Sequence, residues 1–364
     1  MNPNLFYQWT EQVEQHFQAL GKWQAIGLAL LSYGLVLSRH ASLSRIAEEL
    51  TWLGQIESLT KRFKRWIANP RLDMVLASEL WMGWVWQQYD ATRPILLVDE
   101  TKLGDRIGVL MVSLAFEQRA IPLVWRCYRA NSAADYPQQG QVLLVWQLLA
   151  RVLNVIPATC RPVVQMDRGI AHSEAMLRAL DKLGVSYVVR LKGYTRFTSR
   201  RGHSQLLYNM VKPGESLACR GKIFKPAKQV SVWVCLVWEV GQSEGWYLAT
   251  NDPTLGHGLY ARRMWQEEGF RDLKSGGWQW EASHIRCPER MERYILVLAL
   301  AYGWMLTLGS LILASPYPVY SADILKRYSA FRLGLRWFKQ RMWQLPTSLL
   351  VGLFFAPRPQ QLCT

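Results

Sequence analysis

The sequence predicts an α/β protein built on a mixed sheet, with helical segments before and after it. Three consecutive apolar runs of strand length, residues 93–103, 107–116 and 120–128, are separated by short polar turns, a pattern typical of antiparallel strands. Helical and strand-like patterns then alternate from residue 138 to residue 192. This alternation favours a sheet with helices packed on its faces.

The charge balance indicates a polyanionic partner. The 364-residue chain has 43 Lys and Arg against 27 Asp and Glu, a net charge of +16, which points to nucleic acid or an anionic membrane. Half of the residues are hydrophobic, and this excludes a disordered chain. The chain is long enough for two or three structural units. Among its 18 Trp, we expect most to lie in the core, although some can stack on bases.

The cysteines and the apolar stretches favour a cytosolic protein. The six Cys form no CxxC pair and no Cys/His cluster with zinc spacing, so we expect reduced thiols. Residues 1–15 lack the basic and apolar regions of a secretory signal. Residues 23–37 are too short to cross a bilayer. Residues 295–314 contain no charge and would be flagged by a hydropathy scan, but nothing upstream resembles a partner span, and we expect a buried helix.

The first 75 residues have helical patterns. Residues 42–72 predict two helices with a break at Gly54. The second of these helices presents four basic side chains, Lys61, Arg62, Lys64 and Arg65. A basic helix after a short turn is typical of a helix-turn-helix DNA reader, but an ordinary hairpin with a solvated basic face fits the same pattern. Residues 71–88 predict a further helix.

Two carboxylates follow apolar runs of the predicted sheet. Asp99 ends the apolar part of the first run, and Asp167 ends the run at residues 162–167. We expect both at the C-terminal ends of their strands, where open α/β sheets place their sites. Glu100 points to the other face of its strand, and Asp105 falls in the following turn, so neither is a candidate.

The remaining segments complete the predicted organisation. Residues 193–252 are rich in Gly, Ser, Thr and basic residues and alternate in places, which predicts a β-rich insertion. The last fifty residues contain an amphipathic basic helix that packs on the core, contacts DNA or joins two protomers; the sequence does not rank these. The predicted units are residues 1–88, 89–192, 193–252, 253–318 and 319–364.

Residues 260–274 predict one amphipathic helix. At 100° per residue, one face carries a tyrosine, a carboxylate and three cations: Tyr260, Arg263, Glu267, Arg271 and Lys274. The opposite side carries three core residues, Trp265, Phe270 and Leu273. The face is either a solvated surface with ion pairs at i,i+4 or a metal-binding Glu beside phosphate-binding residues. Glu268 lies 100° away from Glu267.

The spacing Tyr-x2-Arg-x3-Glu-x6-Lys, from Tyr260 to Lys274, resembles the signature of the insertion-sequence-four group of DDE transposases. Asp99 and Asp167 precede it in the order of that group, and the resemblance covers residues 93–313. It implies a ribonuclease-H-like α/β core in which Asp99, Asp167 and Glu267 hold two Mg²⁺ ions, with Mn²⁺ as a substitute. Carboxylate oxygens suit such hard ions, and two ions activate the nucleophile and stabilise the leaving oxygen. We expect Asp99 to bridge them.

The resemblance also implies the roles of other residues. Tyr260, Arg263 and Lys274 hold the phosphates near the cleaved bond, and Arg271 on the same predicted face is a further DNA-binding candidate. Arg190 and Lys192, at the end of the predicted strand over residues 186–192, are either further DNA contacts or surface charges that follow a strand. Trp246 stacks on a base flipped out during hairpin formation, or it is a packed strand residue. The expected partner is double-stranded DNA, both transposon ends and target, bound by a homodimer in the bacterial cytoplasm at the nucleoid. The alternatives are a non-cleaving DNA-binding relative, another two-metal nuclease of this fold, and a membrane protein with a basic cytosolic face.

Overall fold

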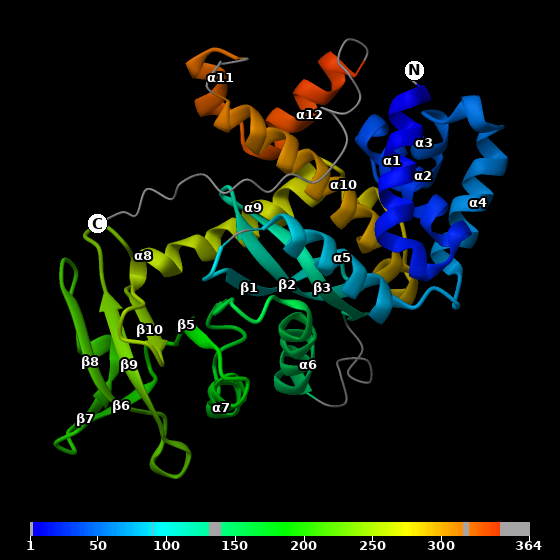
Figure 1. Cartoon of the computed structure of the whole chain (residues 1–364). Helices are drawn as coiled ribbons and strands as arrows, with labels where there is room; N and C mark the ends of the chain where they lie inside the picture. Colours follow the sequence, from blue (N-terminus) through cyan, green and yellow to red (C-terminus); the bar gives the residue numbers. More distant parts are fainter. Residues whose placement is uncertain (1–2, 90, 131–139, 316–319, 343–364) are drawn as a thin grey trace.

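The computed structural model describes residues 3–89, 91–130, 140–315 and 320–342. It is a mixed α/β structure with an N-terminal helical region, a ten-stranded sheet and C-terminal helices (Figure 1). The predicted fold class is therefore confirmed.

The N-terminal region consists of five helices: α1 (Pro3–Phe17), α2 (Lys22–Ser38), α3 (Leu43–Glu48), α4 (Ile56–Ala68) and α5 (Met74–Gln88). Its aromatic residues attach it to the rest of the chain. The indole rings of Trp9 and Trp304 stack with their centroids 3.9 Å apart. The hydroxyl of Tyr294 donates a hydrogen bond to the carbonyl of Ala41. Tryptophans make up half of the twelve largest fully buried side chains among the described residues, in line with the expectation that most Trp lie in the core.

The central sheet has the order β3-β2-β1-β4-β5-β10-β9-β8-β6-β7. The strands of its first half are β1 (Ile95–Leu103), β2 (Ile107–Phe116), β3 (Arg119–Arg129), β4 (Val163–Met166) and β5 (Ser186–Arg190). β1, β2 and β3 form an antiparallel meander, whereas β4 is parallel to both β1 and β5. The parallel connections pass through α6 (Gly140–Val155) and α7 (Glu174–Lys182), because parallel neighbours need a crossover.

The predicted β-rich segment extends this sheet. Its strands are β6 (Arg196–Ser199), β7 (Ser204–Leu206), β8 (Ser216–Ile223), β9 (Val230–Val237) and β10 (Trp246–Thr250). β10 pairs antiparallel with β5 on one side and with β9 on the other. The hydrogen-bonded ladder therefore runs without a break from the core strands into the insertion (Figure 1).

A long apolar helix lies at the centre of the molecule. α10 (Pro288–Ala314) contacts β3, α2, α4, α5 and α12. It is the one helix among the described residues that is long and apolar enough to cross a membrane, and its most apolar window is 94% buried within the protein. Burial on this scale explains its composition, because a helix enclosed on all sides is apolar all round.

The C-terminal region contains α11 (Ala322–Arg327) and α12 (Ala330–Arg341). Ser329 caps α12 by accepting a hydrogen bond from the amide of Arg332. α12 crosses α10 where Gly334 meets Gly309. A Cβ atom at Gly334 would lie 1.8 Å from the carbonyl oxygen of Met305, and one at Gly309 would lie 1.6 Å from that of Ala330. The two glycines therefore permit backbone-to-backbone packing, and α12 packs on the core.

Candidate active site

Two of the predicted carboxylates lie side by side at the middle of the sheet. β1 and β4 are parallel neighbours, and Val98 pairs with Met166. Asp99 and Asp167 directly follow this last pair, so the two carboxylates come at the same end of the β1–β4 ladder. One detail differs from the prediction: β1 does not end at Asp99 but continues to Leu103, because it remains paired with β2 on its other side.

Asp167 is fixed by the turn that follows β4. Its Oδ1 accepts hydrogen bonds from the amides of Gly169, at 2.9 Å, and Ile170, at 3.0 Å. A Cβ atom at Gly169 would lie 3.2 Å from the same oxygen. The glycine therefore leaves room for the carboxylate to fold back over the turn.

Glu267 lies on α9 (Met264–Arg271), and an arginine connects it to β1. Arg263 donates from Nη2 to Oε1 of Glu267 at 2.6 Å, and its Nη1 lies 3.5 Å from Oδ2 of Asp99. The side chains of Arg263 and Asp99 are 14% and 15% exposed, whereas that of Glu267 is 47% exposed. One guanidinium thus joins the buried carboxylate of the strand to the half-exposed carboxylate of the helix.

The charge of Asp99 is disfavoured in this environment. The pKa of Asp99 is raised to about 6, above all by burial and in smaller part by the negative charges of Asp167 and Glu267. The amide of Glu100, which donates to its Oδ1, and the charge of Arg263 act in the opposite direction. All three predicted carboxylates therefore interact electrostatically. Clusters of this kind are typical of functional sites.

The three carboxylates are of the ligand type that divalent ions prefer. Asp99, Asp167 and Glu267 offer only oxygen ligands, which Mg²⁺ and Mn²⁺ prefer. Arg263 supplies the positive charge between two of them, as a bound ion would. Among the described residues, no group of three or more His, Cys, Asp or Glu is close enough to hold a metal ion. The residues fit the ion in type, and the carboxylates stand further apart than a closed site requires.

The predicted single helix over residues 260–274 is wrong. The segment is divided into α8 (His257–Tyr260), a 3₁₀ turn (Ala261–Arg263), α9 and a π-helical turn (Asp272–Gly276). Lys274 has non-helical backbone angles, with φ −84° and ψ −115°. A constant 100° step therefore does not describe the segment, and its five polar residues do not share one face. Phe270 and Leu273 are buried as predicted.

Tyr260 lies inside the protein. Its side chain is 3% exposed and contacts the ring of Trp246 edge-on, with centroids 5.4 Å apart. Burial raises the pKa of Tyr260 well above its usual value. Its hydroxyl has no hydrogen-bond partner among the described residues. An unpaired buried hydroxyl is costly, so Tyr260 retains a donor and an acceptor that the described fold does not use.

Lys274 and Arg271 contact different parts of the protein. Nζ of Lys274 donates to the carbonyl oxygen of Lys102 at 2.7 Å, near the end of β1. Arg271 is exposed and pairs with Glu268, with Nη1 and Oε1 2.8 Å apart. Arg271 therefore belongs to the Glu268 side of the helix, contrary to the predicted common face with Glu267.

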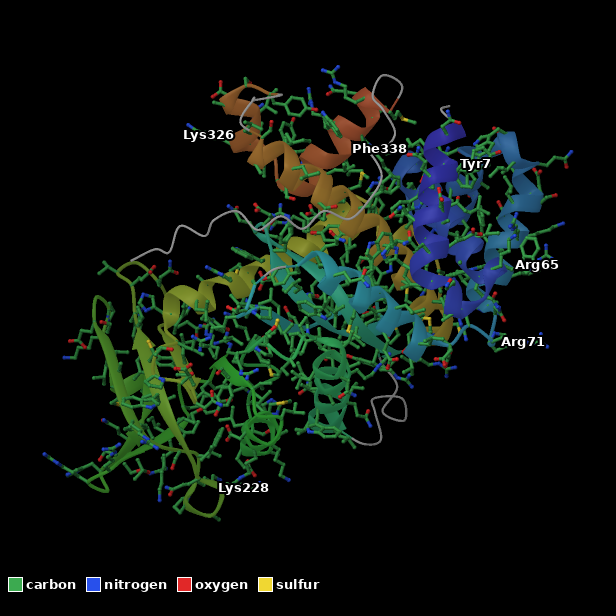
Figure 2. The ribbon with its side chains drawn as sticks, viewed as in Figure 1. Tyr7, Arg65, Arg71, Lys228, Lys326 and Phe338 are labelled. Carbon is green, nitrogen blue, oxygen red and sulfur yellow. The ribbon has the colours of Figure 1, made fainter. Side chains whose placement is uncertain are left out.

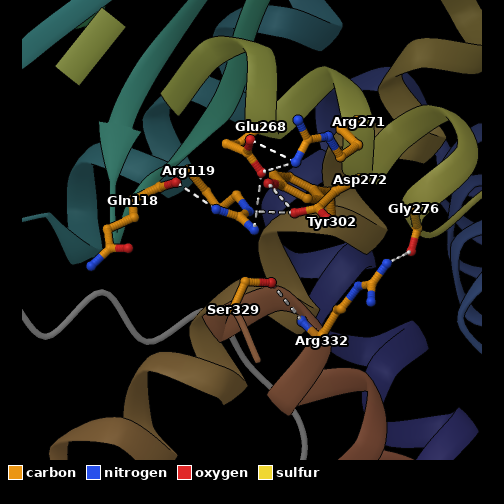
Figure 3. A network of polar contacts seen from close by, with 9 residues as sticks. All are labelled: Gln118, Arg119, Glu268, Arg271, Asp272, Gly276, Tyr302, Ser329 and Arg332. Atoms are coloured by element: carbon orange, nitrogen blue, oxygen red, sulfur yellow. Dashed lines mark hydrogen bonds and ion pairs between the residues drawn. The ribbon is translucent and has the colours of Figure 1, made fainter. Parts of the chain in front are cut away.

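Glu268 belongs to a separate network beneath the helix (Figure 3). Nε of Arg119 donates to Oδ2 of Asp272 at 2.6 Å, and Nη2 of Arg119 lies 3.6 Å from Glu268. The hydroxyl of Tyr302 also donates to Asp272. These contacts tie α9 to β3 and α10. The role of Arg119 could not be predicted from the sequence, because it adjoins a turn between two predicted strands and nothing local to it indicates its partner 153 residues away.

Arg190 and Lys192 lie at the end of β5 and just beyond it. Arg190 donates to Oε1 of Glu244 at 2.6 Å, and Arg168 pairs with the same carboxylate at 2.7 Å. Lys192 lies over the ring of Tyr194. Arg168 directly follows Asp167, and this adjacency was a signal that the sequence analysis did not use.

The basic helix of the N-terminal region matches its prediction. α3, a short turn and α4 follow one another around Gly54. α4 buries Leu59, Phe63, Trp66 and Ile67. Its four basic residues are all exposed: Lys61, Arg62, Lys64 and Arg65. Figure 2 shows Arg65 at the outer edge of the helical region. A basic face is thus presented to solvent.

The fold and the carboxylates together define a class of protein. A ribonuclease-H-like mixed sheet with two aspartates at adjacent strands, and a glutamate on the helix beside them, is the arrangement expected of a DDE transposase. The family described as the transposase DDE domain matches residues 104–304, more than half of the chain. The chain belongs to this family. No curated protein shows a significant match to it. The family match begins after Asp99 and includes Asp167, Glu267 and the Tyr-Arg-Glu-Lys residues.

Proposed function

We propose that this transposase belongs to the insertion-sequence-four group and moves an insertion sequence by cutting and pasting. It binds the terminal inverted repeats of its element as a homodimer and catalyses metal-dependent strand cleavage and strand transfer. The observation that carries this proposal is the placement of Asp99 and Asp167 at the ends of one parallel ladder, with Glu267 joined to Asp99 through the guanidinium of Arg263.

The metal chemistry rests on these three carboxylates. Divalent ions, Mg²⁺ or Mn²⁺, would activate water or a 3′-hydroxyl and stabilise the leaving oxygen. The side chain of Asp99 is less exposed than that of Glu267. The charges of Asp167 and Glu267 both act on Asp99, which suits a ligand shared by both ions. Arg263 partly compensates the charges of Asp99 and Glu267, and its guanidinium would be in reach of a phosphate that approaches them. Lys274 lies at the end of β1, where it would contact the DNA strand whose phosphate approaches Arg263.

DNA contacts extend beyond the carboxylates. The exposed cations of α4, Lys61, Arg62, Lys64 and Arg65, suit the phosphates of a transposon end. Arg190 ends β5 and Lys192 follows it, at the point where the chain enters the insertion. Trp246, beside Tyr260, is the candidate for stacking on a flipped base in a hairpin intermediate. We assign DNA-end binding to residues 1–88 and catalysis to residues 89–192 and 253–318.

Two other functions use the same fold. A domesticated relative would bind DNA without cleaving it, and its usual mark is a lost carboxylate; this chain retains all three. Another two-metal nuclease would not need the complete Tyr-Arg-Glu-Lys series, which Tyr260, Arg263, Glu267 and Lys274 supply. Inverted repeats on both sides of the gene would identify the element and its substrate.

Neighbouring glutamates provide a direct test. Glu267→Gln should abolish cleavage of a DNA that carries the gene and its flanking sequences, while binding of that DNA is retained, since most affinity comes from phosphate contacts. Glu268→Gln is the matched control, because Glu268 pairs with Arg119 and Arg271 instead. Normal cleavage by Glu267→Gln would refute the assignment.

The metal requirement is tested with the unmodified protein. Cleavage should need Mg²⁺ or Mn²⁺, and Ca²⁺ should support binding but little cleavage, since its looser shell positions reactants poorly. Cleavage that persists in excess EDTA would exclude metal-dependent chemistry by these carboxylates.

A further inference from the structure

A basic hollow lies between the C-terminal helix and the end of the π-helical turn. It has a volume of about 470 Å³. Its walls come from α12, from Arg39, which directly follows α2, and from Gly276 and Gly277. The lining residues that carry the argument are Arg39, Gly276, Arg332, Arg336 and Lys339. The hollow is separate from the three carboxylates, none of which lines it.

Three of its cations share one face of α12. Arg332, Arg336 and Lys339 follow one another at i, i+4 and i+7, and all are exposed, whereas Leu333, Gly334, Leu335 and Phe338 are buried. The hollow has no acidic lining residue within the described part of the chain. The sequence supplies few elsewhere: from residue 315 to residue 364 the only Asp or Glu is Asp323. Asp272 acts on Arg332 but is itself paired with Arg119, so Arg336 and Lys339 contribute most of the positive charge that this face presents.

Neutral groups hold the arginines in place. Nη2 of Arg39 donates to the carbonyl oxygen of Leu335 at 2.8 Å. Nη2 of Arg332 donates to the carbonyl oxygen of Gly276 at 3.3 Å, as Figure 3 shows. The guanidinium of Arg336 lies 5.8 Å from the ring centres of both Tyr320 and Tyr328. A carbonyl or a ring fixes a guanidinium without neutralising it. Because each guanidinium has five N–H donors, most of them remain available to a ligand.

The backbone of the hollow is rigidly built and continuous with the signature segment. A Cβ atom at Gly277 would lie 2.5 Å from both the carbonyl oxygen of Asp272 and the ring of Phe331. The close crossing of Gly334 over Gly309 fixes α12 from the other side. Gly276 follows Lys274 by two residues. A ligand in the hollow would therefore contact the same turn that positions Lys274 at the end of β1.

We propose that this hollow binds the phosphate backbone of duplex DNA and continues the DNA path from the carboxylates along α12. This inference rests on the proposed function, because it assigns a further contact to the same DNA. From Arg332 to Lys339 the helix rises about 10 Å, a length over which one strand of B-DNA presents about three phosphates. Guanidinium forks match phosphate oxygens in geometry, and a row of cations without acidic partners suits a repeating anion.

The test measures how binding depends on salt. A fluorescent duplex of arbitrary sequence is titrated with the full chain and with Arg336→Gln/Lys339→Gln across a range of NaCl concentrations. If both side chains contact phosphates, the slope of log affinity against log salt should become shallower by about 1.8, since each contact contributes about 0.9. Arg336→Lys/Lys339→Arg keeps the charge and should keep the slope of the unmodified chain.

A charge-matched control separates a local contact from net charge. Arg178→Gln/Lys182→Gln removes the same charge from α7, which lies far from α12 in Figure 1, and should leave the slope unchanged. An equal loss of slope in this control, or an unchanged slope in Arg336→Gln/Lys339→Gln, would overturn the inference. A melting temperature measured for each variant detects unfolding, and Lys339→Gln alone, at an exposed position, should still lower the slope by about 0.9.

The remaining outcomes also decide. If the unmodified chain shows no salt-dependent DNA binding, the proposed function and this inference fail together. If the unmodified chain binds DNA and Arg336→Gln/Lys339→Gln has the same salt slope, the inference fails and the proposed function stands. A change in oligomeric state by light scattering, with an unchanged salt slope, would assign the face to a second copy of the chain and refute DNA contact.

Discussion

The Nη2 atom of Arg263 donates a 2.6 Å hydrogen bond to Oε1 of Glu267, one helical turn further along the signature segment. The same guanidinium lies 3.5 Å from Oδ2 of Asp99. Arg263 therefore compensates two carboxylates of very different exposure at once. The more buried of them, Asp99, still has a raised pKa, so its compensation is incomplete.

Asp99→Asn should stabilise the protein in the absence of divalent ions. Burial raises the pKa of Asp99 from 3.8 to about 6. A folded-state pKa above the unfolded one means that the charged carboxylate opposes folding at neutral pH, and that this penalty disappears as pH falls below the unfolded value. Two pKa units correspond to about 3 kcal/mol. The neutral amide should recover about 1–3 kcal/mol, measured by denaturant unfolding near neutral pH with EDTA present.

Glu100→Gln is the matched control for this prediction. It removes the same charge from the next residue, on the other face of β1, and should change the free energy of unfolding by less than about 0.5 kcal/mol. Destabilisation by Asp99→Asn would mean that its interaction with Arg263 outweighs the cost of burying its charge.

Gly334→Ala should weaken the packing of α12 on α10. The added Cβ would lie 1.8 Å from the carbonyl oxygen of Met305 and 3.0 Å from the amide nitrogen of Gly309. These are backbone atoms, so the helices must separate, and overpacking of this severity costs about 3 kcal/mol. Thermal unfolding would report the loss, and limited proteolysis between α10 and α12 would locate it.

Gly83→Ala provides the comparison within a helix. Gly83 lies in α5, and a Cβ there would meet nothing within 4 Å. Alanine should raise stability by up to about 1 kcal/mol, because glycine is a poor helix former. Equal effects of the two substitutions would show that helix propensity, not the crossing, governs Gly334.

Local patterns predicted the parts of the fold that local chemistry determines. Three apolar runs placed β1, β2 and β3, and the alternation that followed placed β4 and β5. Asp99 and Asp167 were predicted as site residues because each comes directly after a buried, apolar run of residues. Phe63 and Ile67 were assigned to the buried side of α4 by their helical spacing, and both are buried.

The signature segment was harder to predict because distant contacts set its shape. The break at Lys274 accompanies a hydrogen bond to Lys102, 172 residues away, which no helical period anticipates. Asp272 is buried and paired with Arg119 across a similar distance. Tyr260 appears polar in sequence but packs against Trp246. A strict 100° step therefore placed Arg271 with Glu267, although Arg271 pairs with Glu268, and it did not predict the burial of Tyr260.

Lys61→Gln/Arg62→Gln should weaken binding to the element's ends and flatten its salt dependence. Both side chains are exposed on α4, so substitution should leave the helix intact. Loss of two phosphate contacts lowers the slope by about 1.8, measured by fluorescence anisotropy at several salt concentrations. Arg178→Gln/Lys182→Gln on α7 again matches the charge removed. An unchanged slope would identify the basic face of α4 as solvated only.

Trp246→Ala should act on one step of the reaction. Trp246 begins β10 and is partly exposed, with its ring edge-on to Tyr260. Turning a strand into a hairpin requires an unstacked base, which costs a few kcal/mol, and stacking on an indole returns about 1–3 kcal/mol. We expect first-strand nicking near the normal rate and slower formation and resolution of the hairpin. A denaturing gel that separates nicked, hairpin and double-strand-break products measures each step.

The contact with Tyr260 offers a second explanation, and Trp246→Phe distinguishes the two. Phenylalanine retains an aromatic ring against Tyr260 but presents a smaller surface to a base. If Trp246 stacks on a flipped base, Trp246→Phe should keep the melting temperature of the unmodified chain and show an intermediate hairpin defect. If Trp246 only packs β10 against α8, Trp246→Ala should lower the melting temperature and slow every step equally, and Trp246→Phe should restore both.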